Sequence, residues 1–448
     1  MKKKIQPDVY SITPMNEKLF SEFWRYQYVN DADLRTEDGT RLRVIYPGRP
    51  NDVQGADFKD AVVRSGRIVM KGDVELHLKT VDWQHHRHHT DKRYNRVILH
   101  VVLNSEKNAS TTLQNGNIVP ILRLENRLCY PLEQDIQQIQ GIPCSGIGSG
   151  IYREKVLRII EKEGEKRFFE KAAEIKNESG KSGKDEALYR FIMKTMGYSG
   201  NTEPFLKLAG VLPLKKLMRA EQATLTDGEY LTDLQVLLLG SAGFLDTRYA
   251  GILTSSGIDS VLLRNLQERQ SFSGNRILIS PDDWQLFRIR PGNSPVRRLL
   301  AVCNMLVAFR KQGISNTIIS AVDDIPPEKI RLVLEKLLIQ CAEPDNLQKI
   351  QSGISSSLLG KGRAAVIVVN VLLPFLYTCE HPDKYLAAYL TCPGLPVNSL
   401  ERHMIEQLGL EKTGVSKAVR QQGLVSLYTG FCTQGKCAVC ELRKLESR

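Results

Sequence analysis

The histidines of this chain are concentrated in one short segment. Six of its eight histidines fall within the 24 residues from position 77 to position 100. Imidazole is a common ligand of transition metal ions and exchanges protons near neutral pH. The clustering therefore indicates a site for a metal ion or a phosphate, with candidates His77, His85, His86, His88, His89 and His100. The alternative interpretation is an exposed polar loop in which most of these side chains bind nothing.

The segment from Val74 to Lys79 alternates strictly between apolar and polar residues. Because the side chains of a strand point alternately to two faces, Glu75, His77 and Lys79 are expected on one face. A carboxylate, an imidazole and an ammonium in one row can bind a divalent cation and orient or deprotonate a water molecule.

A second carboxylate, Asp57, begins another expected strand about 18 residues before Glu75. This order, an acid followed by Glu-x-basic on the next strand, is similar to the core of PD-(D/E)XK nucleases. The resemblance implies that Asp57 and Glu75 bind Mg²⁺ or Mn²⁺ and that a basic residue positions the nucleophile. This chain departs from the pattern, since His77 stands where the nucleases have lysine and Lys79 lies two residues further on.

With histidine at this position, His77 could act as the base or as a third metal ligand. As a ligand, its imidazole would favour a softer ion such as Mn²⁺ or Zn²⁺. Lys79 would stabilise phosphate charge. Further candidate ligands are His88 and His89, which follow Trp83 closely, and His100, which lies in an apolar strand. A histidine in such a strand is also compatible with a hydrogen-bonded core residue.

Longer segments resemble the bacterial domain-of-unknown-function family 2851. The first block of this resemblance runs from Gly55 to Val102, and it continues with Met196-Gly197-Tyr198, Glu203-Pro204-Phe205, Arg290-Pro291-Gly292-Asn293, Asn370 to Phe375 and Gln421-Gln422-Gly423-Leu424. Ala56 replaces the proline of the family's usual Gly-Pro-Asp-Phe, and Arg87 replaces the glycine of its His-Gly-His-His. Neither change removes a candidate ligand. The family has no assigned activity, so the resemblance implies no particular reaction.

Three cysteines near the C-terminus have the spacing of metal ligands: Cys432-x4-Cys437-x2-Cys440. Three thiolates are one short of a four-coordinate zinc or iron–sulfur site. Cys392, Cys379 or His403 could supply the fourth ligand. The tail is similar in outline to the cysteine group that completes an iron–sulfur site in some PD-(D/E)XK nucleases. The alternative is a tail of reduced thiols.

The net charge of +12 over 448 residues favours an anionic partner such as DNA or RNA. A denser basic group, which could contact a nucleic-acid backbone, surrounds Trp284 and Phe287 and consists of Arg288, Arg290, Arg297 and Arg298. Alternatively, arginines close to the start of a helix commonly pair with carboxylates. The net positive charge of the chain could also serve solubility alone.

The elements expected from these patterns form two regions. Residues 1–140 are predicted to be an α/β domain with a small mixed sheet, of restriction-endonuclease type if the nuclease resemblance holds. Residues 145–448 are predicted to be mostly helical and to carry the cysteine cluster at their C-terminal end. Within that region, the Gly/Ser/Lys-rich segment 177–184 is predicted to be a loop. The strands of the first region are expected at 42–46, 61–63, 74–79 and 97–103.

No export signal and no apolar run of membrane-spanning length is evident, and the odd number of cysteines, nine, argues against a disulfide framework. We therefore expect a cytoplasmic protein without a membrane partner, and its oligomeric state is left open. The leading hypothesis is a metal-dependent nuclease or phosphodiesterase. The alternatives are a non-enzymatic nucleic-acid-binding protein with structural metal sites and a metal-dependent hydrolase of small molecules.

Overall fold

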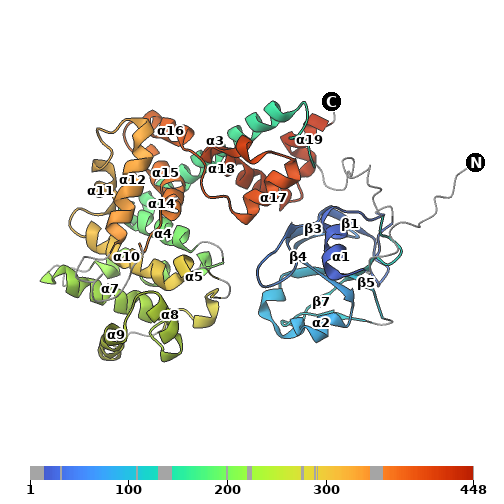
Figure 1. Ribbon diagram of the computed structural model, residues 1–448, viewed down its shortest axis with the longest axis horizontal. Helices are drawn as coiled ribbons and strands as arrows, with labels where there is room; N and C mark the ends of the chain where they lie inside the picture. The colour runs from blue at the N-terminus through green and yellow to red at the C-terminus, as the bar shows by residue number, and fades with distance from the viewer. Residues whose placement is uncertain are drawn as a thin grey trace, which may run out of the picture. The chain divides into compact units, whose positions relative to one another are not determined.

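The structure is a computed structural model, and it forms two compact units (Figure 1). The sheet unit comprises residues 1–163, 397–415 and 423–448, and the helical unit comprises residues 164–396 and 416–422. The residues described are 15–30, 33–106, 109–129, 144–197, 200–218, 224–273, 277–286, 289, 291–343 and 357–446.

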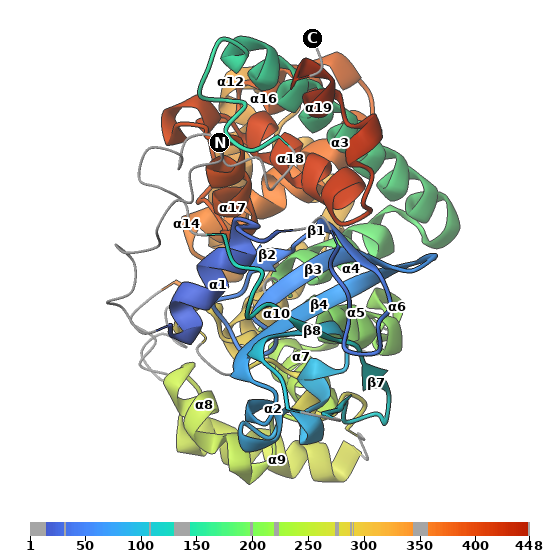
Figure 2. The ribbon, with the colours of Figure 1, turned by 90° about the vertical axis from the view of Figure 1, so that its right-hand side faces the viewer.

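A mixed sheet forms the N-terminal part of the sheet unit, as predicted. Its strands follow the order β1-β3-β4-β5-β8, with the short β2 paired to β3. The first three strands in this order are antiparallel, whereas β4, β5 and β8 are parallel (Figure 2). The bounds are β1 (Leu42–Tyr46), β2 (Arg49–Pro50), β3 (Phe58–Ser65), β4 (Ile68–Lys79), β5 (Val97–Asn104) and β8 (Ile121–Arg123). A separate hairpin consists of β6 (Thr111–Thr112) and β7 (Ile118–Val119).

The two faces of β4 differ as its alternating sequence predicts. Val74 and Leu76 join a buried apolar cluster with Phe20 and Trp24 of helix α1 (Glu17–Arg25), which covers this face. The opposite face carries Glu75 and His77 and is covered by the connection from β4 to β5. That connection contains α2 (Asp82–His85) and the helical turns η1 (His88–Thr90) and η2 (Lys92–Tyr94).

The C-terminal segment packs within the sheet unit. It includes α17 (Ser399–Leu408), the π-helical turn η9 (Tyr428–Cys432), the turn η10 (Cys437–Val439) and α19 (Glu441–Glu446). Two of the hydrogen bonds that join it to the sheet are made by tyrosines. The Tyr46 hydroxyl lies 2.6 Å from Nε2 of His403, and the Tyr428 hydroxyl donates to Oδ2 of Asp60 over 2.9 Å.

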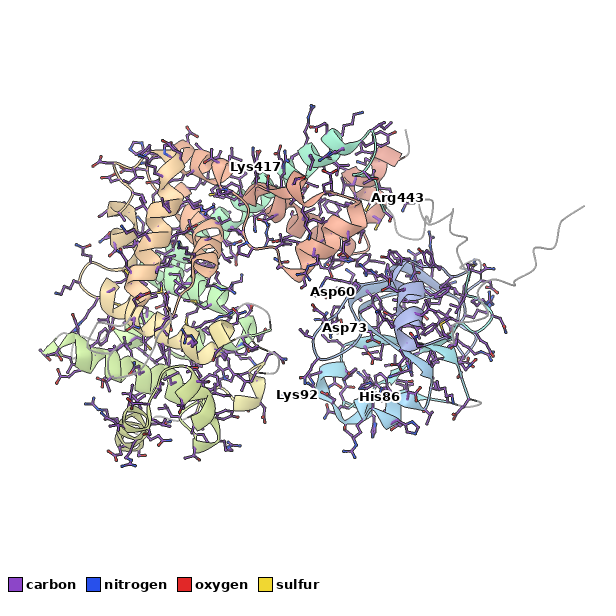
Figure 3. The ribbon with its side chains drawn as sticks, viewed as in Figure 1. Asp60, Asp73, His86, Lys92, Lys417 and Arg443 are labelled. Atoms are coloured by element: carbon purple, nitrogen blue, oxygen red, sulfur yellow. The ribbon has the colours of Figure 1, made fainter. Side chains whose placement is uncertain are left out.

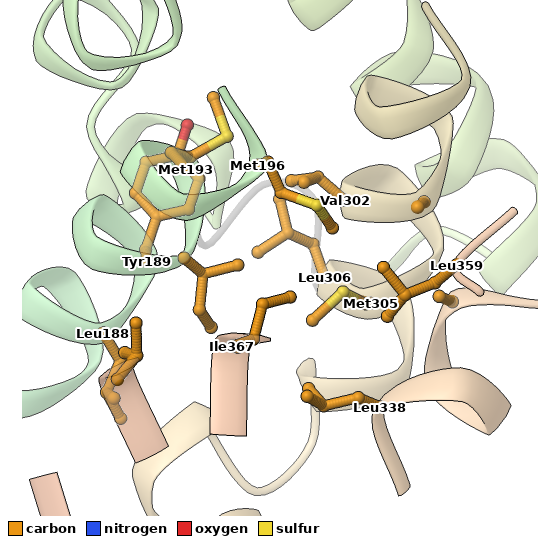
Figure 4. Packing of buried hydrophobic residues seen from close by; sticks show 14 of the residues in the cluster. Leu188, Tyr189, Met193, Met196, Val302, Met305, Leu306, Leu338, Leu359 and Ile367 are labelled. Carbon is orange, nitrogen blue, oxygen red and sulfur yellow. The ribbon is translucent and has the colours of Figure 1, made fainter. Parts of the chain in front are cut away.

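The helical unit is built around one large apolar core, part of which is shown in Figure 4. Helices α3 (Arg153–Ser182) and α18 (Ala418–Leu427) each run from one unit into the other. The other helices of this unit are α4 (Lys184–Met196), α5 (Thr202–Val211), α6 (Leu214–Leu217), α7 (Asp227–Ser241), α8 (Ala250–Ser255), α9 (Ser260–Ser273), α10 (Pro295–Phe309), α11 (Ile314–Ser320), α12 (Pro327–Ala342), α14 (Lys361–Ile367), α15 (Leu373–Tyr377) and α16 (Pro382–Thr391).

The loop predicted at residues 177–184 is wrong. Helix α3 continues to Ser182, and only Gly183, with a φ of 93°, separates it from α4. The helix therefore includes Gly180, at which no atom lies near the position that a Cβ atom would take. An ion pair of 2.7 Å between Glu178 and Arg190 of α4 stabilises this last turn.

Two further properties of the described residues bear on the sequence predictions. No described helix combines the length and the apolar character needed to cross a bilayer. All nine cysteines are free thiols, in agreement with the absence of a disulfide framework.

Candidate metal centre

Asp57, directly before β3, lies beside Glu75 of the antiparallel neighbour β4. The amide of Asp57 donates to Oε2 of Glu75 over 3.0 Å, and the amide of Leu76 donates to Oδ2 of Asp57 over 3.0 Å. Burial, followed by the charge of Glu75, raises the pKa of Asp57 to about 7, and burial raises the pKa of Glu75 to about 8. Two carboxyl groups removed from water at one point are an environment that a bound cation would stabilise.

Three imidazoles form one group, and two of them contact the Glu75 carboxylate. Its Oε1 atom lies 3.2 Å from Nε2 of His88 and 3.7 Å from Nε2 of His77. Nε2 of His77 in turn lies 3.1 Å from Nδ1 of His86. One ligand atom from each of His77, His86 and His88 can be chosen so that all three lie within 4.8 Å of one another. This spacing allows the three side chains to bind one metal ion.

The protonation of these histidines suits metal binding. Burial lowers the pKa values of His77 and His88, so both rings are neutral and have a free electron pair for a metal ion. Within the described residues, the buried Nδ1 atom of His89 has no hydrogen-bond partner, and the buried Nε2 atom of His88 makes no hydrogen bond although it lies 3.2 Å from Oε1 of Glu75. Buried polar atoms are almost always satisfied, so an unpaired nitrogen beside Glu75 fits a site that binds an ion.

A hydrogen-bonded chain behind His77 can fix the orientation of its ring. Nδ1 of His77 lies 2.9 Å from Nε2 of His100, and Nδ1 of His100 lies 2.7 Å from the Thr111 hydroxyl. If each Nδ1 carries the proton, His100 donates to Thr111 and His77 donates to His100. Nε2 of His77 is then the atom with the free electron pair, and it faces Glu75 and His86. Such outer partners commonly orient metal-binding histidines.

Aromatic side chains enclose the site. The ring of Tyr94 stacks on His88 with centroids 3.9 Å apart, and Trp83 packs edge-on against His77 and His88. The indole N–H of Trp83 donates to the carbonyl of Thr112 over 3.1 Å, which attaches α2 to the β6–β7 hairpin. Arg87, which begins the turn that carries His88, has a φ of 60°. This backbone conformation favours glycine, which is the usual residue at this position in the family that the sequence resembles.

The structure therefore brings together four of the predicted site residues, Asp57, Glu75, His77 and His88. His100 lies behind them, with both ring nitrogens hydrogen-bonded. Lys79 is exposed at the end of β4, and His89 is half-buried in η1. The predicted cysteines lie elsewhere in the sheet unit, where Cys432, Cys437 and Cys440 line one pocket.

His86 is a member of the imidazole group that the sequence pattern placed in the histidine cluster but not beside Glu75. It is exposed, unlike His77 and His88, and it comes close to His77 only because α2 folds back over β4. Figure 3 shows it together with Lys92 in the part of the sheet unit that contains the β4–β5 connection. The His-rich turn was the available signal, but it did not distinguish His86 from its exposed neighbour His85.

The two arginines of the predicted basic group that can be placed contribute to the fold instead. Arg298 is buried and donates to the carbonyl of Met196 over 2.6 Å, and Arg297 donates to the carbonyl of Ser357 over 3.1 Å. Both guanidinium groups thus hold backbone carbonyls of the helical unit. The other members, Phe287, Arg288 and Arg290, lie outside the described residues.

Comparison with known families agrees with the resemblance found in the sequence. A family model described as "Protein of unknown function (DUF2851)" matches residues 17–389. The chain belongs to this family. The matched range contains the whole candidate metal centre and ends before the C-terminal cysteines. Comparisons with curated proteins and with solved structures gave no match.

Proposed function

We propose that the protein is a metal-dependent phosphodiesterase of the nuclease type. The observation that carries the proposal is the position of the Glu75 carboxylate, which contacts the Asp57 amide on one side and lies within 3.2 Å and 3.7 Å of His88 and His77 on the other. Two acidic residues on adjacent strands are also what the resemblance to PD-(D/E)XK nucleases requires. A restriction-endonuclease-like core is part of the same proposal.

The ligand set favours a transition metal over Mg²⁺. His77, His86 and His88 would supply three nitrogen ligands and Glu75 an oxygen, with Asp57 adjacent as the second carboxylate. Imidazole suits Mn²⁺ and Zn²⁺, whereas Mg²⁺ binds mainly oxygen and retains water. When bound, the ion would polarise a phosphate oxygen and lower the pKa of water. In this scheme His77 is a ligand rather than the base, and His100 and Thr111 orient it.

Exposed cations near the turn would favour an anionic substrate. Arg87 and Lys92 flank the His88–His89 turn in sequence, and Lys79 ends the strand that carries Glu75; all three are exposed. His86 is the exposed member of the metal group, so a phosphate would approach the ion from its side. These cations and the net charge of +12 favour a nucleic acid over a neutral small molecule.

The proposal is tested by incubating the purified protein with labelled DNA and RNA in Mn²⁺, Zn²⁺ or Mg²⁺. Cleavage is expected with Mn²⁺ or Zn²⁺, and Glu75→Gln is expected to lower it by at least about 100-fold. The matched control is Glu37→Gln, which changes an exposed carboxylate paired with Arg123 in the same unit and should leave cleavage unchanged.

Undiminished cleavage by Glu75→Gln, or cleavage that persists in chelator, would refute the assignment of this site. Hydrolysis of a small phosphodiester such as bis(p-nitrophenyl) phosphate without cleavage of DNA or RNA would support the small-molecule alternative. Metal-independent binding of nucleic acid without hydrolysis would support the non-enzymatic one.

A further inference from the structure

Four cysteines meet at one pocket of the sheet unit. Cys432, Cys437 and Cys440 from the C-terminal segment line it together with Cys144, which sequence spacing did not associate with them. Cys144, Cys432 and Cys440 are buried, and Cys437 is half-buried. The four cysteines thus line one pocket as free thiols.

The C-terminal three cysteines are held by a tight turn against the sheet. Cys432 ends η9, Cys437 begins η10, and Cys440 directly precedes α19. Between them, Gly435 has a φ of 65°, and a Cβ atom there would lie 2.9 Å from Cγ1 of Val62 in β3. Only glycine therefore allows this turn both its conformation and its close approach to the sheet.

Cys144 is positioned by a different part of the fold. It begins the turn before α3 with a φ of 61°, and this turn is bonded to the end of α17. The amide of Gly146 donates to the carbonyl of Gln407 over 2.8 Å. The side-chain amide of Gln407 in turn donates to the Cys144 sulfur over 3.5 Å. N–H groups directed at cysteine sulfurs are a usual feature of metal–thiolate sites.

The surroundings suit a negatively charged metal–thiolate group. Arg443, which is labelled in Figure 3, lines the same pocket as the four cysteines and adds a cation to its wall. Tyr46 and Phe431 supply aromatic walls, which limit access of water and oxidants.

The fourth ligands predicted from the sequence are engaged elsewhere. Cys392 and Cys379 belong to the helical unit, where their sulfurs lie 3.1 Å and 3.7 Å from carbonyls of their own helices. Nε2 of His403 is 2.6 Å from the Tyr46 hydroxyl. Cys144 is therefore the candidate for the fourth ligand of the cysteine site, in place of these three residues.

The spacing of the sulfurs distinguishes zinc from an iron–sulfur cluster. Bonds of about 2.3 Å in a tetrahedron place the sulfurs of a zinc site about 3.8 Å apart. Among the described residues, the only set of three candidate ligand atoms within 4.8 Å of one another is the histidine group, so no three of these sulfurs are that close. Thiolates that bind separate iron atoms of a cluster stand farther apart than thiolates that share one ion.

We propose that Cys144, Cys432, Cys437 and Cys440 bind an iron–sulfur cluster. The cluster would join the turn before α3 and the C-terminal segment at one point beside the sheet. It is structural in this assignment, and it does not depend on the metal centre at Glu75 or on the reaction proposed there.

The test is to purify the full chain without oxygen from iron-supplemented cells and to measure iron, acid-labile sulfide and zinc. About two or four iron ions per chain are expected, with an equal number of sulfides and the visible absorption of iron–sulfur charge transfer. Cys144→Ser and Cys437→Ser should each lose most of the iron. Cys129→Ser, which changes an exposed cysteine of the same unit, should retain it.

The assays on the unmodified protein decide the matter even where a variant fails to fold. One zinc per chain without iron would overturn the iron–sulfur assignment. A native protein whose four thiols all react with a thiol reagent, and which holds neither metal, would overturn the site itself. Full iron content in a folded Cys144→Ser variant would remove Cys144 from the ligand set.

Discussion

Replacing His86 with alanine should weaken metal binding without weakening the fold. The side chain is exposed, and exposed substitutions usually change the free energy of unfolding by less than about 0.5 kcal/mol. Its Nδ1 atom nevertheless lies 3.1 Å from Nε2 of His77, inside the group of three imidazoles. His86→Ala therefore removes one ligand from the site and leaves the buried part of the site in place.

The size of the effect follows from linkage between binding and unfolding. Loss of one ligand is expected to weaken affinity by about 100-fold, the upper end of what outer-sphere changes cause. At a metal concentration 100 times the wild-type Kd, binding stabilises the wild type by about 2.7 kcal/mol and the variant by about 0.4 kcal/mol. For a unit of this size the corresponding rises in Tm are about 5–10 °C and about 1 °C.

The assay is thermal unfolding with and without Mn²⁺ or Zn²⁺, followed by calorimetry. His85→Ala is the matched control, because His85 is the preceding residue, 67% exposed, and its Nδ1 lies 3.5 Å from Asp82 rather than in the imidazole group. It should keep the full metal-induced rise in Tm. A His86→Ala protein that responds to metal like the wild type, or a His85→Ala protein that loses the response equally, would refute the reasoning.

Three other perturbations have defined outcomes. Thr111→Val removes the hydroxyl 2.7 Å from His100 and should weaken metal binding by about 10-fold in calorimetric titration; unchanged affinity would contradict the orienting role. Burial lowers the pKa of His403 from 6.5 to about 3, so the neutral ring favours the folded state and its contribution is lost as pH falls below 6.5. Urea unfolding should show about 2 kcal/mol less stability at pH 5 than at pH 7 from this group, a difference that should disappear in His403→Gln. Gly423→Ala would place a Cβ atom against the Ile160 carbonyl in the sheet unit, and it should lower the free energy of unfolding by about 1–3 kcal/mol. The control Gly430→Ala adds its Cβ atom to open space and should lower that free energy less.

Local patterns were sufficient to predict the face of the sheet that carries the site. The alternation from Val74 to Lys79 separates the residues that pack under α1 from Glu75 and His77, and the structure has this arrangement. The mixed sheet followed by a large helical region was also predictable, because strand-like and helical patterns occupy different parts of the chain. Asp57 could be paired with Glu75 because β3, which directly follows Asp57, and β4 are consecutive and antiparallel.

Contacts between distant segments were not predictable from one sequence. Cys144 approaches the C-terminal cysteines only because its turn is bonded to α17, which comes more than 250 residues later in the chain. The choice of His86 over His85 depends on how α2 turns back over β4, and no periodicity in the His-rich segment specifies that. Lys79 was placed correctly on the Glu75 face, but its position at the end of β4 leaves it exposed.

The most direct test of the central claim is a crystal structure of the protein soaked with Mn²⁺ or Zn²⁺, with anomalous scattering used to locate the ion. One peak is expected about 2.0–2.2 Å from His77 Nε2, His86 Nδ1 and a ring nitrogen of His88. The Glu75 carboxylate, which lies 3.2 Å from Nε2 of His88, is expected as an oxygen ligand. An ion bound away from these imidazoles, or no ion in this region of the sheet unit at saturating metal, would contradict the central claim.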